Sequence, residues 1–201
     1  MQTEIEAKWL DVDLPSFRKK LLALHATLQY PERFMRRRNF DYPDKRLESI
    51  GGWIRVRDEG DIITLSYKQL QDRTLHGTKE ITLQVHDFEK TCQFLLAIGL
   101  QQTSYQETKR EKWILDGNEI TLDTWPWIPP FVEIESPDEA SLRAAAQTLQ
   151  LPWSEALHGS VETAYQKYYD VTESEIDNWE TITFIPIPGW LAKKRISSDK
   201  I

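Results

Sequence analysis

Carboxylate and cationic side chains recur two residues apart at several places in this sequence. The first set is Glu4, Glu6 and Lys8, which alternate with Ile5 and Ala7. The later sets are Arg55 with Arg57, Thr64 with Ser66 and Lys68, Glu80 with Thr82, Glu119 with Thr121 and Asp123, and Glu133 with Glu135. Residues two apart lie on the same face of a β-strand, so each set predicts one charged strand face.

These charges are sorted by strand rather than mixed. Arg55 and Arg57 are basic, whereas Glu133 and Glu135 are acidic. Two like charges ~4 Å apart repel by about 4 kcal/mol at an effective dielectric of 20, and a divalent cation would relieve this. Carboxylates suit Mg²⁺ or Mn²⁺, and Arg and Lys suit phosphate oxygens. If the charged faces point inward, a triphosphate fits the basic side chains and its metal fits the acidic ones. The alternative is that the charged side chains form the solvated face of an antiparallel sheet.

The elements that must carry these residues are mostly strands. Alternating patterns with intervening turn residues predict strands at residues 3–10, 34–41, 52–58, 61–69, 78–86, 105–115, 118–124 and 130–136. Apolar residues at helical spacing predict helices at 14–29, 88–98 and 138–149, with shorter helices at 160–169 and 173–180. Eight antiparallel strands with side helices predict an α+β domain built on a barrel or a strongly curved sheet.

Composition narrows the class of protein. The 201 residues suit one domain over residues 1–201, and no linker or repeat divides them. A net charge of −7 disfavours general binding to nucleic acid or to anionic membranes. No apolar run approaches the ~20 residues of a membrane span, the charged opening residues do not predict a signal peptide, and Cys92 is the single cysteine. We therefore expect a cytoplasmic protein.

Five motifs, in order and all on one strand parity, resemble the CYTH superfamily of triphosphate tunnel metalloenzymes. That superfamily includes class IV bacterial adenylate cyclases, thiamine triphosphatases and inorganic triphosphatases. The motifs are Glu4 to Lys8, Phe40 to Asp44, Trp53 to Arg57, Thr64 to Lys68, and Leu122-Asp123 followed by Phe131 to Glu135. The resemblance covers about residues 3–165 and leaves a helical or extended tail at about 171–201.

The resemblance implies an eight-stranded antiparallel β-barrel that forms a tunnel, with flanking helices. It also implies roles for the charged residues. Those expected to bind the phosphates are Lys8, Arg55, Arg57, Lys68 and Arg110; Arg38 is a further candidate from its place in the predicted strand rather than from the resemblance. Those expected to hold Mg²⁺ or Mn²⁺ are Glu4, Glu6, Asp123, Glu133 and Glu135. Those expected to take part in catalysis are Glu4, Glu6, Lys8 and Glu80.

The sequence departs from the family pattern in two places. Thr82 stands where the family has a second acid after Glu80, which puts the positioning of a second metal or of the attacking water in doubt. The basic pair before the hairpin is not a clear match, so the partner of Arg110 is Lys112 or nothing. Arg36 shares the parity of Arg38, and the pair adds to the basic wall or is a solvated edge.

The implied activity is metal-dependent hydrolysis of a small triphosphate, either inorganic or a nucleoside or thiamine triphosphate. Water would attack the phosphorus in line, so no nucleophilic side chain is needed. An adenylate cyclase would use the same residues plus a base pocket, for which Trp125 and Trp127 are candidates. A non-catalytic polyphosphate-binding module would need only the basic half, and an RNA 5′-triphosphatase is disfavoured by the acidic net charge. Assembly as a homodimer is left open.

Overall fold

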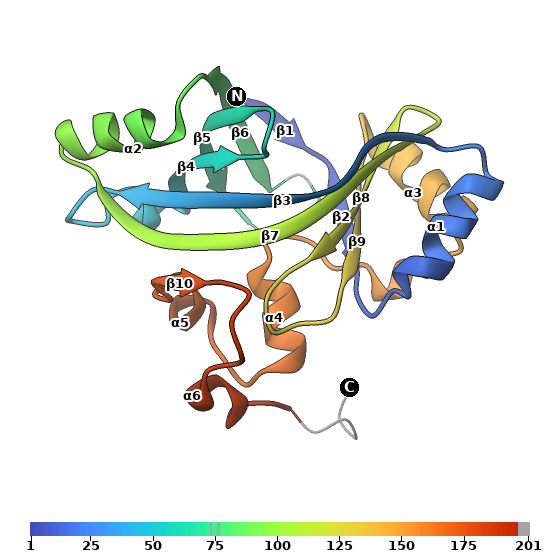
Figure 1. Cartoon of the computed structure of the whole chain (residues 1–201). Coiled ribbons are helices and arrows are strands. Elements are labelled where there is room, and N and C mark those ends of the chain that lie inside the picture. Colours follow the sequence, from blue (N-terminus) through green and yellow to red (C-terminus); the bar gives the residue numbers. More distant parts are fainter. Residues whose placement is uncertain (73, 76, 197–201) are drawn as a thin grey trace.

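Ten β-strands and six α-helices form over the part of the chain that the computed structural model describes, which is residues 1–196 without residues 73 and 76. The strands are β1 (Gln2–Glu4), β2 (Glu6–Trp9), β3 (Thr27–Asp41), β4 (Gly52–Asp58), β5 (Ile63–Leu70), β6 (Thr78–Val85), β7 (Gln101–Leu115), β8 (Asn118–Thr124), β9 (Phe131–Glu135) and β10 (Thr181–Ile182). The helices are α1 (Leu14–Ala23), α2 (Phe88–Ala97), α3 (Glu139–Thr148), α4 (Glu162–Tyr168), α5 (Glu173–Asp177) and α6 (Gly189–Ala192). The predicted α+β class is confirmed (Figure 1).

The strands belong to a single curved sheet in the order β1-β6-β5-β4-β3-β7-β8-β9-β2. The pairs along this path are antiparallel, and β10 adds to β7 in parallel. The long strands β3 and β7 run side by side across the whole molecule (Figure 1). The prediction of a closed eight-stranded barrel is not confirmed, because this sheet has more strands within the described residues and its path is open.

The two ends of the sheet path meet on one segment of the chain. The predicted strand 3–10 divides at Ile5 into β1, which pairs with β6, and β2, which pairs with β9. The carbonyl of Ile5 accepts a hydrogen bond from the backbone N–H of Ser136 at 3.0 Å, so the division is anchored. The N-terminal segment therefore spans the opening between the two edges of the sheet.

Three apolar clusters hold the outer face of the sheet. Helices α1 and α3 cover β2, β8 and β9, where Trp9, Leu21 and Ile134 are buried. Helix α2 covers β3 and β4 through Phe40, Val56 and other residues. The third cluster packs the C-terminal helices against the loop between β8 and β9. Apolar residues thus occupy the outside of the strands, which leaves the charged parity on the inside.

The starts of α1 and α2 lie where the sequence predicts them, but α1 ends earlier than predicted. The Asp13 and Asp87 side chains accept hydrogen bonds from Ser16 N–H and Lys90 N–H, as expected of N-cap residues. The predicted helix 14–29 ends at Ala23 instead, because His25 takes a left-handed conformation at φ 57° and the chain enters β3 at Thr27. The pairing of β3 with β7 is irregular around Tyr30, so the first half of β3 shows no regular alternation of apolar and polar residues and was not predicted as a strand.

The C-terminal segment covers an exposed edge of the sheet. Strand β8 pairs with β7 only from Lys109 onward, and β10 pairs with β7 at Tyr105 and Gln106, beyond the end of β8. Helices α4 and α5 lie below this part of β7 (Figure 1). The tail beyond residue 196 lies outside the described residues. Within the described residues, no helix is both long and apolar enough to cross a membrane.

Candidate functional site

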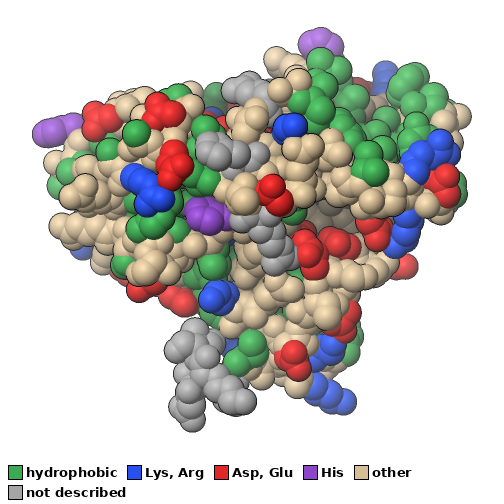
Figure 2. All heavy atoms as spheres, turned by 180° about the vertical axis from the view of Figure 1, so that it is seen from behind, with side chains coloured by type: hydrophobic (Ala, Val, Ile, Leu, Met, Phe, Trp, Pro, Cys, Tyr) green, Lys and Arg blue, Asp and Glu red, His purple; other side chains and the backbone are tan. Residues whose placement is uncertain are grey.

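A cavity of about 560 Å³ lies inside the curve of the sheet. It is lined by strands from both halves of the path and by the C-terminal segment. The predicted site residues that line it are Glu4, Glu6, Arg55, Arg57, Lys68, Glu80, Arg110, Glu133 and Glu135. From behind, acidic side chains gather beside a hollow in the surface (Figure 2). The side chains that the sequence analysis selected therefore lie in one cavity. The role of each of them stays a prediction.

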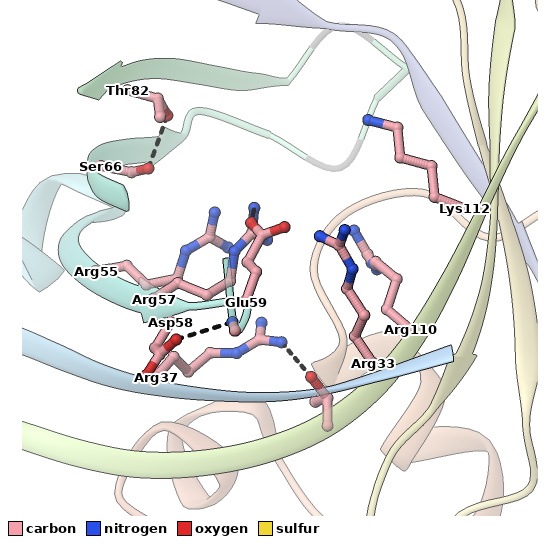
Figure 3. A network of polar contacts seen from close by, with 12 residues as sticks. Arg33, Arg37, Arg55, Arg57, Asp58, Glu59, Ser66, Thr82, Arg110 and Lys112 are labelled. Carbon is pink, nitrogen blue, oxygen red and sulfur yellow. Dashed lines mark hydrogen bonds and ion pairs between the residues drawn. The ribbon is translucent and has the colours of Figure 1, made fainter. Parts of the chain in front are cut away.

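Four arginines on three strands form a group that we call the arginine cluster: Arg37, Arg55, Arg57 and Arg110. Arg37 lies opposite Arg57 in the pairing of β3 with β4, and Arg55 lies one step along β4. Their side chains extend into the space that the strands enclose (Figure 3). Guanidinium groups at this density match the oxygens of a phosphate chain.

Carboxylate partners satisfy three members of the arginine cluster but not Arg37. The pairs are Arg55 with Glu80 at 3.4 Å, Arg57 with Glu59 at 2.5 Å, and Arg110 with Asp123 at 2.6 Å and with Glu133 at 2.7 Å. Arg37 donates instead to Thr108 Oγ1 at 2.7 Å and lies over the Trp125 ring at 4.7 Å; it forms no ion pair with any described residue. Burial, and then the charges of Arg55 and Arg57, lower the pKa of Arg37 well below its usual value. A buried guanidinium without an ion-pair partner is costly, so Arg37 is the member of the cluster that an anion in the cavity would stabilise most.

Arg37 was missed by the sequence analysis, which named Arg38 as a phosphate-binding candidate and left Arg36 and Arg38 as either part of the basic wall or a solvated edge. The structure places Arg38 outside the cavity, where it pairs with Glu89 of α2 at 2.8 Å. The reason is the parity of β3, because Phe40 has the same parity and packs beneath α2. Grouping the even residues of β3 with this apolar side chain would have placed Arg37 inside.

Lys8 and Asp123 lie behind the cavity surface rather than on it. The Lys8 ammonium is buried, donates to the carbonyl of Gly159, and lies 3.4 Å from Glu133. Both oxygens of Asp123 accept hydrogen bonds from Arg110, at 2.6 and 2.9 Å. In this structure the two residues therefore anchor Glu133 and Arg110. Phosphate contact by Lys8 and metal binding by Asp123 stay predictions.

Three carboxylates stand side by side opposite the arginines, and we call them the acidic row: Glu6, Glu135 and Glu119. Glu135 pairs across the sheet with Glu6 on β2 and with Glu119 on β8. Burial, and then the charges of Glu119 and Glu6, raise the pKa of Glu135; burial and Glu133 raise that of Glu6. Like charges directly across a sheet destabilise it, and a cation would relieve them. No three His, Cys, Asp or Glu side chains of the described residues are already gathered as metal ligands.

Glu4 and Glu80 share one lysine at the edge of the cavity. Lys68 Nζ lies 3.0 Å from Glu4 and 3.1 Å from Glu80. Burial, and then a hydrogen bond with Glu80, raise the pKa of Glu4 to about 8. Thr82 donates to Glu80 at 2.6 Å and hydrogen-bonds with Ser66 at 2.7 Å (Figure 3). The threonine that replaces an acid of the family pattern thus holds Glu80 in place.

A further wall of the cavity comes from residues 160–182, which we call the C-terminal wall. It presents three acids that the sequence analysis did not select: Glu162 on α4, and Glu173 and Asp177 on α5. The Oε2 atom of Glu162 is buried without a hydrogen-bond partner among the described residues. Burial, and then the charge of Asp177, raise the pKa of Glu162 to about 7. An acid kept in such a place destabilises the fold and is a candidate for a functional role.

Replacing Glu162 with glutamine should stabilise the protein at pH 8. The carboxyl pKa is about 7 in the folded chain and near 4.5 in the unfolded chain, so ionisation favours unfolding as the pH rises from 4.5 to 7. The amide removes this destabilising contribution of ionisation, and we expect a gain in the free energy of unfolding of about 3 kcal/mol at pH 8 and about 1 kcal/mol at pH 5. Urea unfolding of both proteins at the two pH values measures it. An equal gain at both would contradict the titration account.

Comparison with known proteins agrees with this geometry. The sequence matches the family model of the CYTH domain over residues 2–170. Comparison with curated protein sequences gives no match.

Solved structures share the fold at low sequence identity. A proposed adenylate cyclase of Vibrio parahaemolyticus gives a TM-score of 0.70 at 17% identity, over 82% of this chain and 98% of its own. A protein of Pyrococcus horikoshii OT3 gives a TM-score of 0.64 at 19% identity, over 76% of this chain and 93% of its own. A proposed adenylyl cyclase of Hippeastrum with a dominant triphosphatase activity gives a TM-score of 0.57 at 14% identity, over 92% of this chain and 98% of its own.

Proposed function

Because this chain belongs to the CYTH domain family, we propose that it hydrolyses a small triphosphate in the cavity with the help of a divalent cation. The observation that carries the proposal is the arginine cluster, in which the buried Arg37 has no ion pair with any described residue, in the same cavity as the acidic row, where Glu135 lies across from Glu6 and Glu119. An anion and a cation bound together would neutralise both walls, and a triphosphate with its metal is such a pair.

The sheet supports enclosure of the substrate. Strands β1 and β2 end the sheet path on opposite edges, yet only Ile5 separates them along the chain. We propose that this join lets the open sheet act as a tunnel around the triphosphate. Exclusion of water from such a site would strengthen every contact with phosphate.

The carboxylates fit Mg²⁺ or Mn²⁺ by their chemistry. The ligands that we propose are Glu4, Glu6, Glu133 and Glu135, whose oxygens are hard donors on neighbouring strands. Asp123 is the weakest candidate, since Arg110 occupies both of its oxygens. When bound, the cation would polarise phosphate oxygens and offset the charge that develops on them.

The residues of the chain itself bind and orient the phosphates. Arg37, Arg55 and Arg57 supply donors from one wall, and Lys68 supplies a further charge between Glu4 and Glu80. Such chemistry is mainly positioning and electrostatics, so it needs no covalent nucleophile. Hydrolysis consumes one water and yields orthophosphate and, from inorganic triphosphate, pyrophosphate.

The tryptophans support the hydrolase over the cyclase. Trp125 is buried, with the guanidinium of Arg37 over its ring and Tyr165 at its edge. Trp127 packs against Trp179 in the C-terminal cluster. Both rings make contacts within the protein, which favours a packing role for them over stacking on an adenine, although Trp125 also lines the cavity.

Substrate turnover tests the proposal directly. The purified protein is incubated with inorganic triphosphate, ATP or thiamine triphosphate, with Mg²⁺, with Mn²⁺ or with a chelator. We expect metal-dependent release of orthophosphate from at least one of them. Cyclic AMP with pyrophosphate would establish a cyclase instead, and metal-dependent binding without any product would establish a binding module.

A further inference from the structure

The C-terminal wall faces the cavity with acids for which neither phosphate binding nor the proposed metal site has a use. Glu162, Glu173 and Asp177 line the same cavity as the arginine cluster but come from helices α4 and α5, outside the inner sheet face. A wall that only closed the cavity could be apolar, as Ile176 and Ile182 of the same segment are. The acids therefore call for a reason of their own.

The wall is firmly attached rather than loosely laid against the opening. Tyr165 on α4 donates to the carbonyl of Pro126 at 2.9 Å, and β10 pairs with β7 at Tyr105 and Gln106. Just before the wall, the Gly159 carbonyl accepts the buried Lys8 ammonium. Because these contacts come from β2, from β7 and from the loop between β8 and β9, we treat the acids as fixed charges at the cavity surface.

Glu162 is the member of the C-terminal wall with a buried carboxylate oxygen that has no hydrogen-bond partner among the described residues. This oxygen, Oε2, belongs to a side chain that lines the cavity. The wall also lies close behind the arginine cluster, since Trp125 contacts Arg37 on one side and Tyr165 of α4 on the other. An anion that reaches past the cluster on this side therefore approaches the Glu162 carboxylate, which the charge of Lys8 offsets only in part, since the pKa of Glu162 stays raised to about 7.

The size of the cavity does not limit the substrate by itself. A volume of about 560 Å³ lies within the range of pockets that hold drug-sized ligands. A chain of more than three phosphates could therefore enter on steric grounds. Any limit on its length has to come from charge.

We propose that Glu162, with Glu173 and Asp177, forms an anion-repelling end of the cavity that limits the bound phosphate chain to three phosphates. The inference rests on the proposed function, since it takes the arginine cluster as the site of the triphosphate. A fourth phosphate would have to leave the cluster and approach the C-terminal wall. The wall thus selects short phosphate chains over longer linear ones.

Calorimetric titration at pH 8 without metal tests this limit. Inorganic triphosphate and linear tetraphosphate are titrated into the wild-type protein, into Glu162→Gln, and into Glu162→Gln combined with Asp177→Asn. We expect the wild type to prefer triphosphate by about tenfold, because repulsion between like charges a few ångströms apart is worth a kcal/mol or more. In the double variant the two affinities should differ by less than about twofold.

A matched control carries the same change of charge elsewhere on this segment. Asp170→Asn neutralises an exposed acid that does not line the cavity, and its preference should equal that of the wild type. An unchanged preference in the single and double variants, with both folded by circular dichroism, would overturn the inference alone. Equal affinity of the wild type for the two chains would also overturn it. Failure of the wild type to bind either chain would overturn the inference, and the proposed function would fall with it only if the metal-dependent turnover described above were also absent.

Discussion

Replacing Arg37 with methionine is expected to weaken the binding of inorganic triphosphate by about a hundredfold, since a desolvated charge pair is worth roughly 3 kcal/mol. The same change should stabilise the empty protein. Arg37 is buried among Arg55, Arg57 and Arg110 and forms no ion pair with any described residue, and methionine fills a similar volume without a charge. Opposite signs for affinity and stability would distinguish a binding residue from a structural one.

Arg38→Met is the matched control for this experiment. It removes the same side chain from the next position of β3, but on the outer face where Arg38 pairs with Glu89. We expect its triphosphate affinity to stay within about twofold of the wild type, because exposed ion pairs contribute little. Affinity is measured by calorimetry and stability by urea unfolding. Equal losses of affinity in the two variants would remove Arg37 from the site.

The strands could be predicted from the sequence wherever one face is apolar and the other charged. Alternation placed Arg55 and Arg57 of β4, and Glu133 and Glu135 of β9, on the inner face, because a shift of one residue would bury their charges under helices. Pairing between distant strands cannot be deduced from such patterns. The change of partner at Ile5, which leaves the sheet open, depends on tertiary contacts to β6 and β9.

The candidate site was predicted where charge and parity agree and missed where they conflict. Arg36, Arg37 and Arg38 are identical neighbours on β3, so their own sequence does not show which of them points inward. The apolar Phe40 shows it, because it marks the outer face of the strand. The acids of the C-terminal wall, such as Glu162, lie on helices, where a two-residue spacing has no meaning. These acids reach the cavity because the C-terminal segment packs against β7, where β10 pairs with Tyr105 and Gln106.

Converting Glu6 and Glu135 together to glutamine should lower kcat/KM for the metal-dependent reaction by about a thousandfold, because binding and polarisation of phosphate by the metal are both lost. The two carboxylates face each other across β2 and β9, and burial together with neighbouring carboxylates raises the pKa of each. Two amides in these positions neither repel each other nor bind a hard cation well. The metal-free protein should therefore become more stable while the shift of its Tm by Mn²⁺ disappears.

Glu32→Gln provides the control, since Glu32 is an exposed carboxylate of β3 outside the cavity. Its turnover, and the shift of its Tm by Mn²⁺, should match those of the wild type. A double variant that keeps both the Mn²⁺ shift and near-normal turnover would place the metal elsewhere than on the acidic row. A double variant that is less stable without metal would show instead that Glu6 and Glu135 support the fold, and the repulsion inferred from their pairing would be wrong.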